Sequence, residues 1–157
     1  MTSVSIGSTL GRERTLVYLV DTSVLTRMRR PTIGTTLLGL GRIFYSPISG
    51  LDLRYSASNE ADYKKLTTIL DGFDRLELAD SVFDTADRTQ LLLARAGLKG
   101  RPLPDLVIAA QAELAGLTVL HYDADFDLIA SVTGQPTLWI SRPGSIDQPM
   151  RAYWVHA

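Results

Sequence analysis

Two apolar runs that each end in an aspartate constrain the fold of this chain most. The first is LVYLVD, which ends at Asp21, and the second is LTVLHYD, which ends at Asp123. A continuous apolar run of about four to eight residues is typical of a strand buried on both faces of a parallel sheet. Ligands of open α/β sheets bind beyond the carboxyl ends of such strands. We therefore expect the two aspartates to lie at a ligand-binding edge of a sheet.

The composition is that of an ordinary globular domain. The chain has 157 residues, of which 45% are hydrophobic and 21% charged, and a formal net charge of −1. It therefore lacks the basic character of a dedicated nucleic-acid binder, although pocket carboxylates would also lower the net charge of a nuclease. Cysteine is absent, which excludes disulfides and thiolate metal sites. Without an apolar signal core or a run long enough to span a membrane, a cytoplasmic protein is expected.

Hydrophobic periodicity and turn residues predict alternating strands and helices. Strands are predicted at residues 16–20, 43–49, 76–78, 118–122 and 137–140. Helices are predicted at 21–31, 35–41, 51–59, 60–73, 81–96, 105–116 and 125–132, with Pro31 ending the first of them. This alternation indicates an α/β fold with a mostly parallel sheet and helices on both faces. Residues 1–14 and 147–157 are expected to be tails around one domain at 15–146.

Five aspartates are candidate metal ligands or catalytic groups: Asp21, Asp52, Asp105, Asp123 and Asp125. Taken singly, each has a structural explanation as a helix cap, a first-turn acid, a turn residue or an exposed helical residue. Taken together, most of them fall at strand ends or helix starts, which the predicted fold places on one edge. Carboxylates gathered there repel one another, and a divalent cation is their natural counter-charge. We therefore predict a metal site that activates water against a phosphodiester.

Histidine-based acid–base chemistry is not expected. The chain has two histidines, His121 and His156, and His156 lies in the last two residues. We therefore do not expect the histidine pair that metal-free ribonucleases commonly use. His121 precedes Asp123 by two residues on one predicted strand and therefore points to the same side. It is a candidate supporting residue that tunes the site or touches substrate, although a satisfied structural role is favoured.

The ordered motifs of the chain resemble those of PIN domains, and most closely those of the VapC-like ribonuclease toxins. The segments that carry the resemblance are VDTSVL, LPDLVIAAQAELAGL and LHYDADFDLIA, followed by PTLWI, and it extends over about residues 16–146. The resemblance implies a three-layer α/β/α sandwich and an endoribonuclease dependent on Mg²⁺ or Mn²⁺. It also implies a homodimer and inhibition by a cognate antitoxin.

The resemblance also assigns roles to individual residues. The acids of the family carry over to Asp21, Asp105, Asp123 and Asp125. Ser23 matches a small hydroxyl residue that often supports the first acid. Two positions depart from the family pattern. Asp52 stands where a glutamate is usual, so its shorter side chain has less reach toward a metal, and His121 stands where many members have threonine.

Candidate binding surfaces lie beside the predicted site. Two basic groups are candidates for RNA phosphates, with a solvated helix end and a polar loop as the alternatives. They comprise Arg27, Arg29 and Arg30 in the first group, and Lys99 and Arg101 in the second. An apolar patch is either a groove for an anchor of the antitoxin or part of the core. It comprises Leu37, Leu38, Leu40 and Ile43.

Two other functions remain open at this point. One is a catalytically degenerate PIN-like module that binds RNA or protein without cutting, which the Asp52 departure motivates. The other is an α/β phosphatase with Asp21 as its nucleophile. That class generally has a second acid two residues after the nucleophile, where this chain has Ser23.

Overall fold

The computed structural model describes residues 16–146, and both predicted tails lie outside the described residues. The strands are β1 (Val17–Val20), β2 (Arg42–Tyr45), β3 (Asp74–Arg75), β4 (Thr118–His121) and β5 (Thr137–Trp139). The helices are α1 (Thr22–Leu25), α2 (Pro31–Gly39), α3 (Pro47–Tyr55), α4 (Glu60–Leu70), α5 (Ser81–Arg95), α6 (Leu103–Ala115) and α7 (Asp125–Thr133). Over these residues no helix has both the length and the apolar character that a bilayer span requires.

All strand pairs are parallel, and the strand order is β3-β2-β1-β4-β5. The chain builds outward from β1 to β2 and β3 on one side, then returns to place β4 and β5 on the other. The carboxyl ends of β1 and β4 therefore lie at the point where the strand order reverses, which is where open α/β sheets bind ligands. Asp21 and Asp123 follow these two strands, as the sequence predicts.

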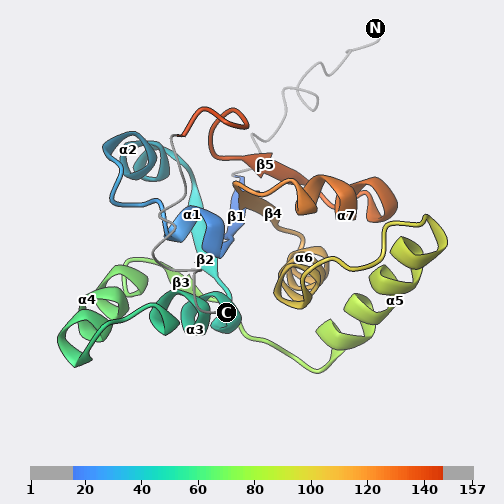
Figure 1. Ribbon diagram of the computed structural model, residues 1–157, viewed down its shortest axis with the longest axis horizontal. Coiled ribbons are helices and arrows are strands. Elements are labelled where there is room, and N and C mark those ends of the chain that lie inside the picture. Colours follow the sequence, from blue (N-terminus) through green and yellow to red (C-terminus); the bar gives the residue numbers. More distant parts are fainter. Residues whose placement is uncertain (1–15, 147–157) are drawn as a thin grey trace, which may run out of the picture.

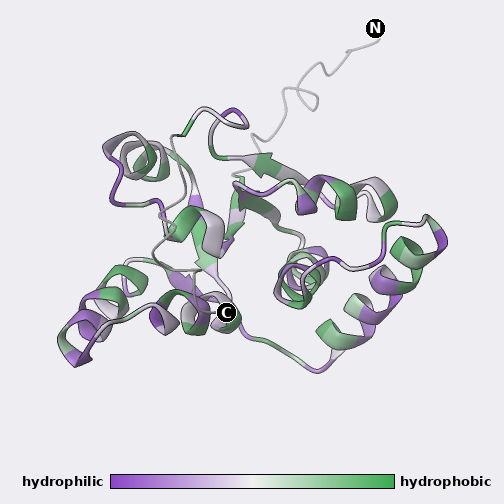
Figure 2. Cartoon of the chain, in the orientation of Figure 1, coloured by the Kyte–Doolittle hydropathy of each residue, from purple (hydrophilic) through white to green (hydrophobic). Residues whose placement is uncertain are grey.

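The two faces of the sheet support separate cores. Leu19 and Val119 face a core formed with α5, α6 and α7, whereas Val20 and Leu120 face a core formed with α1 to α4. The helices accordingly lie on opposite sides of the sheet (Figure 1). The strands of the middle layer are largely hydrophobic, while α4 and α5 carry hydrophilic stripes (Figure 2). The predicted three-layer α/β/α sandwich is confirmed.

Helix boundaries differ from the prediction at Pro31. This residue begins α2 instead of ending the preceding helix, which stops at Leu25. Proline suits the first position of a helix because its missing N–H would have no intrahelical partner there. The same local signal, a proline after a polar stretch, therefore fits a helix start as well as a helix end.

Two predicted strands are also wrong in extent. The strand expected at 43–49 ends at Tyr45, because the Ser46 hydroxyl accepts the N–H of Ile48 at 3.3 Å and caps α3. The third strand is β3, where Asp74 and Arg75 pair with β2, and not residues 76–78. Leu76 and Leu78 instead pack as partly buried side chains against the core beneath α5, α6 and α7.

Candidate metal centre

Asp21 leaves the end of β1 and caps α1. Its Oδ2 accepts the backbone N–H of Ser23 at 3.0 Å, and the residue is 3% exposed. Burial raises the pKa of Asp21 to about 6, although the hydrogen bonds from Ser23 oppose the shift. The capping position fixes this carboxylate at the crevice between β1 and β4.

Asp105 occupies the third position of α6, where the chain enters the helix through Leu103 and Pro104. It is 7% exposed, and its Oδ2 is buried without a hydrogen-bond partner. Burial raises the pKa of Asp105 to about 8, and the negative charges of Asp21 and Asp123 add to the shift. An ionised carboxylate in this position requires a positive partner.

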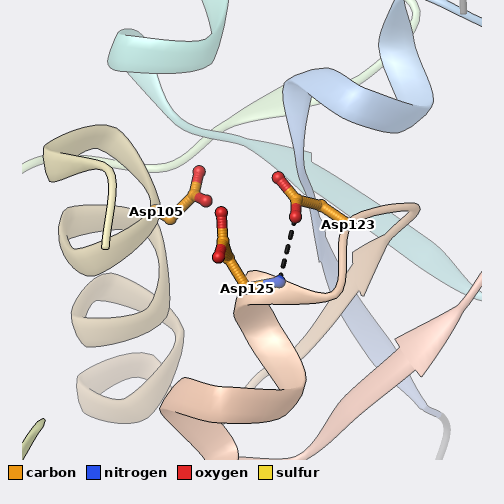
Figure 3. Close-up of side chains that lie close together, drawn as sticks. All are labelled: Asp105, Asp123 and Asp125. Carbon is orange, nitrogen blue, oxygen red and sulfur yellow. Dashed lines mark hydrogen bonds between the residues drawn. The ribbon is translucent and has the colours of Figure 1, made fainter. Parts of the chain in front are cut away.

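Asp123 lies in the turn between β4 and α7, and Asp125 is the first residue of α7. Asp123 accepts the N–H of Asp125 through Oδ1 at 2.9 Å, and its own N–H donates to Nδ1 of His121 at 3.2 Å. Burial raises the pKa of Asp123. With Asp105, these residues form an acidic trio whose nearest ligand atoms all lie within 4.8 Å of one another (Figure 3).

Two members of the acidic trio, Asp105 and Asp123, line a polar pocket of about 180 Å³ at the switch point of the sheet. The predicted acids in its lining are Asp21, Asp52, Asp105 and Asp123. Hard oxygen donors at this separation suit a divalent cation such as Mg²⁺, and the unpartnered oxygen of Asp105 gives such an ion a ready ligand. The residues present therefore fit a divalent metal, in agreement with the chemistry expected from the sequence.

Asp52 reaches the pocket from a different helix. It lies on α3, is partly buried, and lines the same pocket as Asp21 and Asp105. Burial raises its pKa. Asp52 and Asp21 lie outside the acidic trio, so the structure divides the predicted acids into the trio and two further carboxylates of the pocket wall.

The predicted supporting residues, Ser23 and His121, hold the ends of the two central strands. The Ser23 hydroxyl accepts the backbone N–H of Tyr122 at 2.9 Å, which ties the start of α1 to the end of β4. His121 is fully buried, and its ring lies 5.1 Å from that of Phe126 and 4.8 Å from that of Trp139. Burial lowers the pKa of His121 to about 4, so a neutral imidazole supports the backbone of Asp123 from within the core.

Arg27 and Arg101 are the basic candidates that the structure brings to the acidic residues. Arg27 lines the pocket; its Nη1 donates to the carbonyl oxygen of Ser23 at 2.5 Å, and its guanidinium lies 4.7 Å from the centre of the Tyr122 ring. Arg101 forms an ion pair with Asp125 at 2.5 Å. Both residues therefore place positive charge beside the acidic site.

The other three basic candidates are not part of the pocket lining. Arg29 and Lys99 are exposed, and Arg29 borders a separate hollow over α3 and α4. Arg30 precedes the first residue of α2 as its N-cap.

The pocket also contains Thr22, Thr26 and Tyr122, which sequence reasoning missed. Thr22 and Tyr122 are chain neighbours of Asp21 and Asp123, so their positions beside the two strand-end acids were available as a signal. Nothing in the sequence marked Thr26, which reaches the pocket because α1 ends after a single turn.

Comparison with known proteins agrees with the fold. The PIN domain matches residues 18–132. Ribonuclease VapC51 of Mycobacterium tuberculosis is 47% identical over 135 residues, which cover 84% of this chain and 98% of the relative. Ribonuclease VapC18 of the same organism is 39% identical over 137 residues, which cover 83% of this chain and all of the relative.

Solved structures share the architecture at low sequence identity. The structure of VapBC-1 from nontypeable Haemophilus influenzae superposes with a TM-score of 0.69 at 18% identity and covers 80% of this chain and 98% of its own. DNA-bound VapBC from Salmonella typhimurium superposes with a TM-score of 0.64 at 20% identity and covers 80% of this chain and 99% of its own. At this identity the likeness concerns the fold. From the match over residues 18–132 and the VapC relatives, the chain belongs to the PIN domain family.

Proposed function

We propose that this chain is a divalent-metal-dependent endoribonuclease that uses Mg²⁺ or Mn²⁺ and acts as the toxin of a toxin–antitoxin pair in the cytoplasm. The observation that carries the proposal is the acidic trio at the switch point of the sheet, with ligand atoms within 4.8 Å of one another. Relatives named as VapC ribonucleases at 47% and 39% identity support the same activity.

The carboxylates of the site have two proposed roles. In this proposal Asp105, Asp123 and Asp125 hold the ion, and Asp21 and Asp52 complete the negative pocket wall. A divalent ion, when bound, supplies positive charge at the scissile phosphate and makes a water molecule more acidic. The products expected from attack by water are RNA ends that carry 5′-phosphates.

Arg27 is the residue best placed to orient the phosphate. It lines the pocket, and its guanidinium is restrained by the carbonyl of Ser23 and the ring of Tyr122. A restrained guanidinium loses little side-chain entropy when it binds a phosphate oxygen. Arg101 is the second proposed RNA contact. Arg29, Arg30 and Lys99 lie outside the pocket lining, and we propose them only as outer contacts along the RNA backbone.

Two protein contacts belong to the proposal. A groove of about 560 Å³ lined by Leu37, Leu38 and Leu40 is the proposed binding site for an apolar anchor of the antitoxin, and Leu38 is 89% exposed there.

A homodimer is supported by Leu51 and Tyr55 on α3, which are 66% and 74% exposed beside Asp52. Light scattering tests the dimer, and a Tyr55→Lys variant with the same mass in solution as the wild type contradicts this interface.

The decisive experiment is cleavage of a mixed RNA pool with product ends mapped. Wild-type protein should cut with Mg²⁺ or Mn²⁺ and stop in chelator, and Asp105→Asn should lower the rate on the order of 100-fold or more. Asp87→Asn, which removes an exposed carboxylate of α5, is the matched control and should leave the rate unchanged. Equal cleavage in chelator, or cyclic phosphate ends, contradicts the proposal. RNA binding without cleavage under any divalent ion favours a catalytically degenerate module.

A further inference from the structure

Arg101 already places a positive charge on one member of the acidic trio. It lies in the segment between α5 and α6, and its Nη1 is 2.5 Å from Oδ1 of Asp125. The side chains of Arg101 and Asp125 are 26% and 23% exposed, so the pair is only partly screened by solvent. The same Asp125 is within ligand distance of Asp105 and Asp123.

We propose that Arg101 is the built-in counter-cation of the acidic site and that a divalent ion must displace its guanidinium from Asp125 in order to bind. The inference rests on the proposed function, because it assumes that the trio is a metal site. A metal ion and a guanidinium compete for the same carboxylate oxygen, and like charges close together repel each other. Arg101 thereby sets the concentration of divalent ion at which the site fills.

The hydrogen bonding of Arg101 indicates that the pair is exchangeable. Its Nε is buried without a partner, so the guanidinium is held by an incompletely satisfied network. Asp105 is likewise left with an unpartnered oxygen, while Arg101 donates its hydrogen bond to Asp125. One guanidinium thus satisfies the trio only in part, and an ion bound among the three carboxylates would satisfy more of it.

A purely structural role for Arg101 makes a different prediction. If the ion pair only fastened the segment before α6 to the start of α7, its loss would loosen the trio and weaken metal binding. If Arg101 is a competing cation, its loss strengthens metal binding. The sign of the change in metal affinity therefore separates the two roles, and lysine, which keeps the charge, should keep the competition.

The test is calorimetric titration of Mn²⁺ alone into the full chain without RNA. Arg101→Gln should lower the Kd for Mn²⁺ about tenfold relative to the wild type, which corresponds to about 1.4 kcal/mol. Arg101→Lys should remain within about twofold of the wild type. Arg88→Gln is the control, because Arg88 on α5 pairs with Glu113 on α6 at 2.6 Å and neither residue belongs to the acidic trio, and it should leave the Kd unchanged. An unchanged or higher Kd in Arg101→Gln overturns the inference.

A second measurement needs no variant with altered charge. In the wild-type chain, the NMR signal of the Arg101 Nε–H group, assigned by its loss in Arg101→Lys, should shift in step with Mg²⁺ occupancy while the Arg88 signal stays fixed. A static Arg101 signal at saturating Mg²⁺ overturns the inference. If neither the wild type nor Arg101→Gln binds Mn²⁺, the proposed function itself fails, whereas binding with equal Kd refutes only the role of Arg101.

Discussion

Replacement of Asp105 by asparagine should flatten the pH dependence of stability in metal-free protein. Asp105 is 7% exposed, one of its oxygens has no partner, and its pKa is raised to about 8. The ordinary value of 3.8 applies when the chain is unfolded. Between these values the folded state keeps a proton that the unfolded state has lost. The stabilisation that Asp105 contributes is therefore fully present below its unfolded pKa of 3.8, and it is lost as the pH rises through its folded pKa of about 8.

The size of the effect follows from this difference in bound protons. One extra proton on the folded state changes the free energy of unfolding by about 1.4 kcal/mol for each pH unit. From pH 5 to pH 7 the Asp105 carboxyl alone should therefore lower the free energy of unfolding of the wild type by about 3 kcal/mol. Asparagine carries no ionisable proton, so Asp105→Asn should lose about 3 kcal/mol less over the same interval. Asp21, whose pKa is raised to about 6, contributes the same trend in both proteins.

Urea unfolding in chelator at pH 5, 6 and 7 measures this difference. Asp87→Asn is the control, because it removes an exposed carboxylate from α5 and should keep the wild-type slope. Addition of Mn²⁺ at pH 7 should then stabilise the wild type by mass action and Asp105→Asn much less. Parallel pH profiles for the wild type and Asp105→Asn, or a wild type that gains stability from pH 5 to pH 7, would refute the reasoning.

Three further variants probe the supports of the site. Ser23→Ala removes the hydroxyl that accepts the N–H of Tyr122 at 2.9 Å. This variant should lower the free energy of unfolding by about 1–2 kcal/mol and slow RNA cleavage. An unchanged urea midpoint would contradict this role of Ser23. Gln111→Leu removes an amide that donates to two backbone carbonyls after β3, at 3.0 and 2.9 Å. Urea unfolding should show a free energy of unfolding lower by about 2 kcal/mol. An unchanged free energy would show that water replaces the amide. Gly116→Ala should lower the free energy of unfolding by about 1 kcal/mol from backbone strain alone, because φ is +68° and no atom lies within 4 Å of an added Cβ. A stabilised variant would mean that the end of α6 changes conformation.

The central strands and their terminal acids could be predicted because their signals are local. The apolar runs before Asp21 and Asp123 are typical of strands that are buried on both faces of a sheet, and β1 and β4 do pair in parallel. The alternation of strands with amphipathic helices fixed the layers in the same way. Gly116, in the left-handed conformation, ends α6 where the prediction placed a helix stop.

The start of α2 and the position of β3 could not be predicted, because their signals are ambiguous or not local. Pro31 fits either end of a helix, and the structure uses it as a start. β3 has two residues and exists because Phe44 and Tyr45 lie opposite them in the sheet. Its position depends on β2 and the packing of α4, which no window of sequence around Asp74 contains.

The sequence by itself determined which residue types stand at the ends of the central strands and at the start of α6, and with them the kind of chemistry that the site supports. Only the tertiary structure decided the distances and the charge states. It brought a carboxylate oxygen of Asp105 within 4.8 Å of those of Asp123 and Asp125, and it buried Asp105 deeply enough to raise its pKa. It also paired Arg101 with Asp125. The physical reason is that coulombic interaction and desolvation depend on neighbours in space, and these neighbours come from segments far apart in the chain.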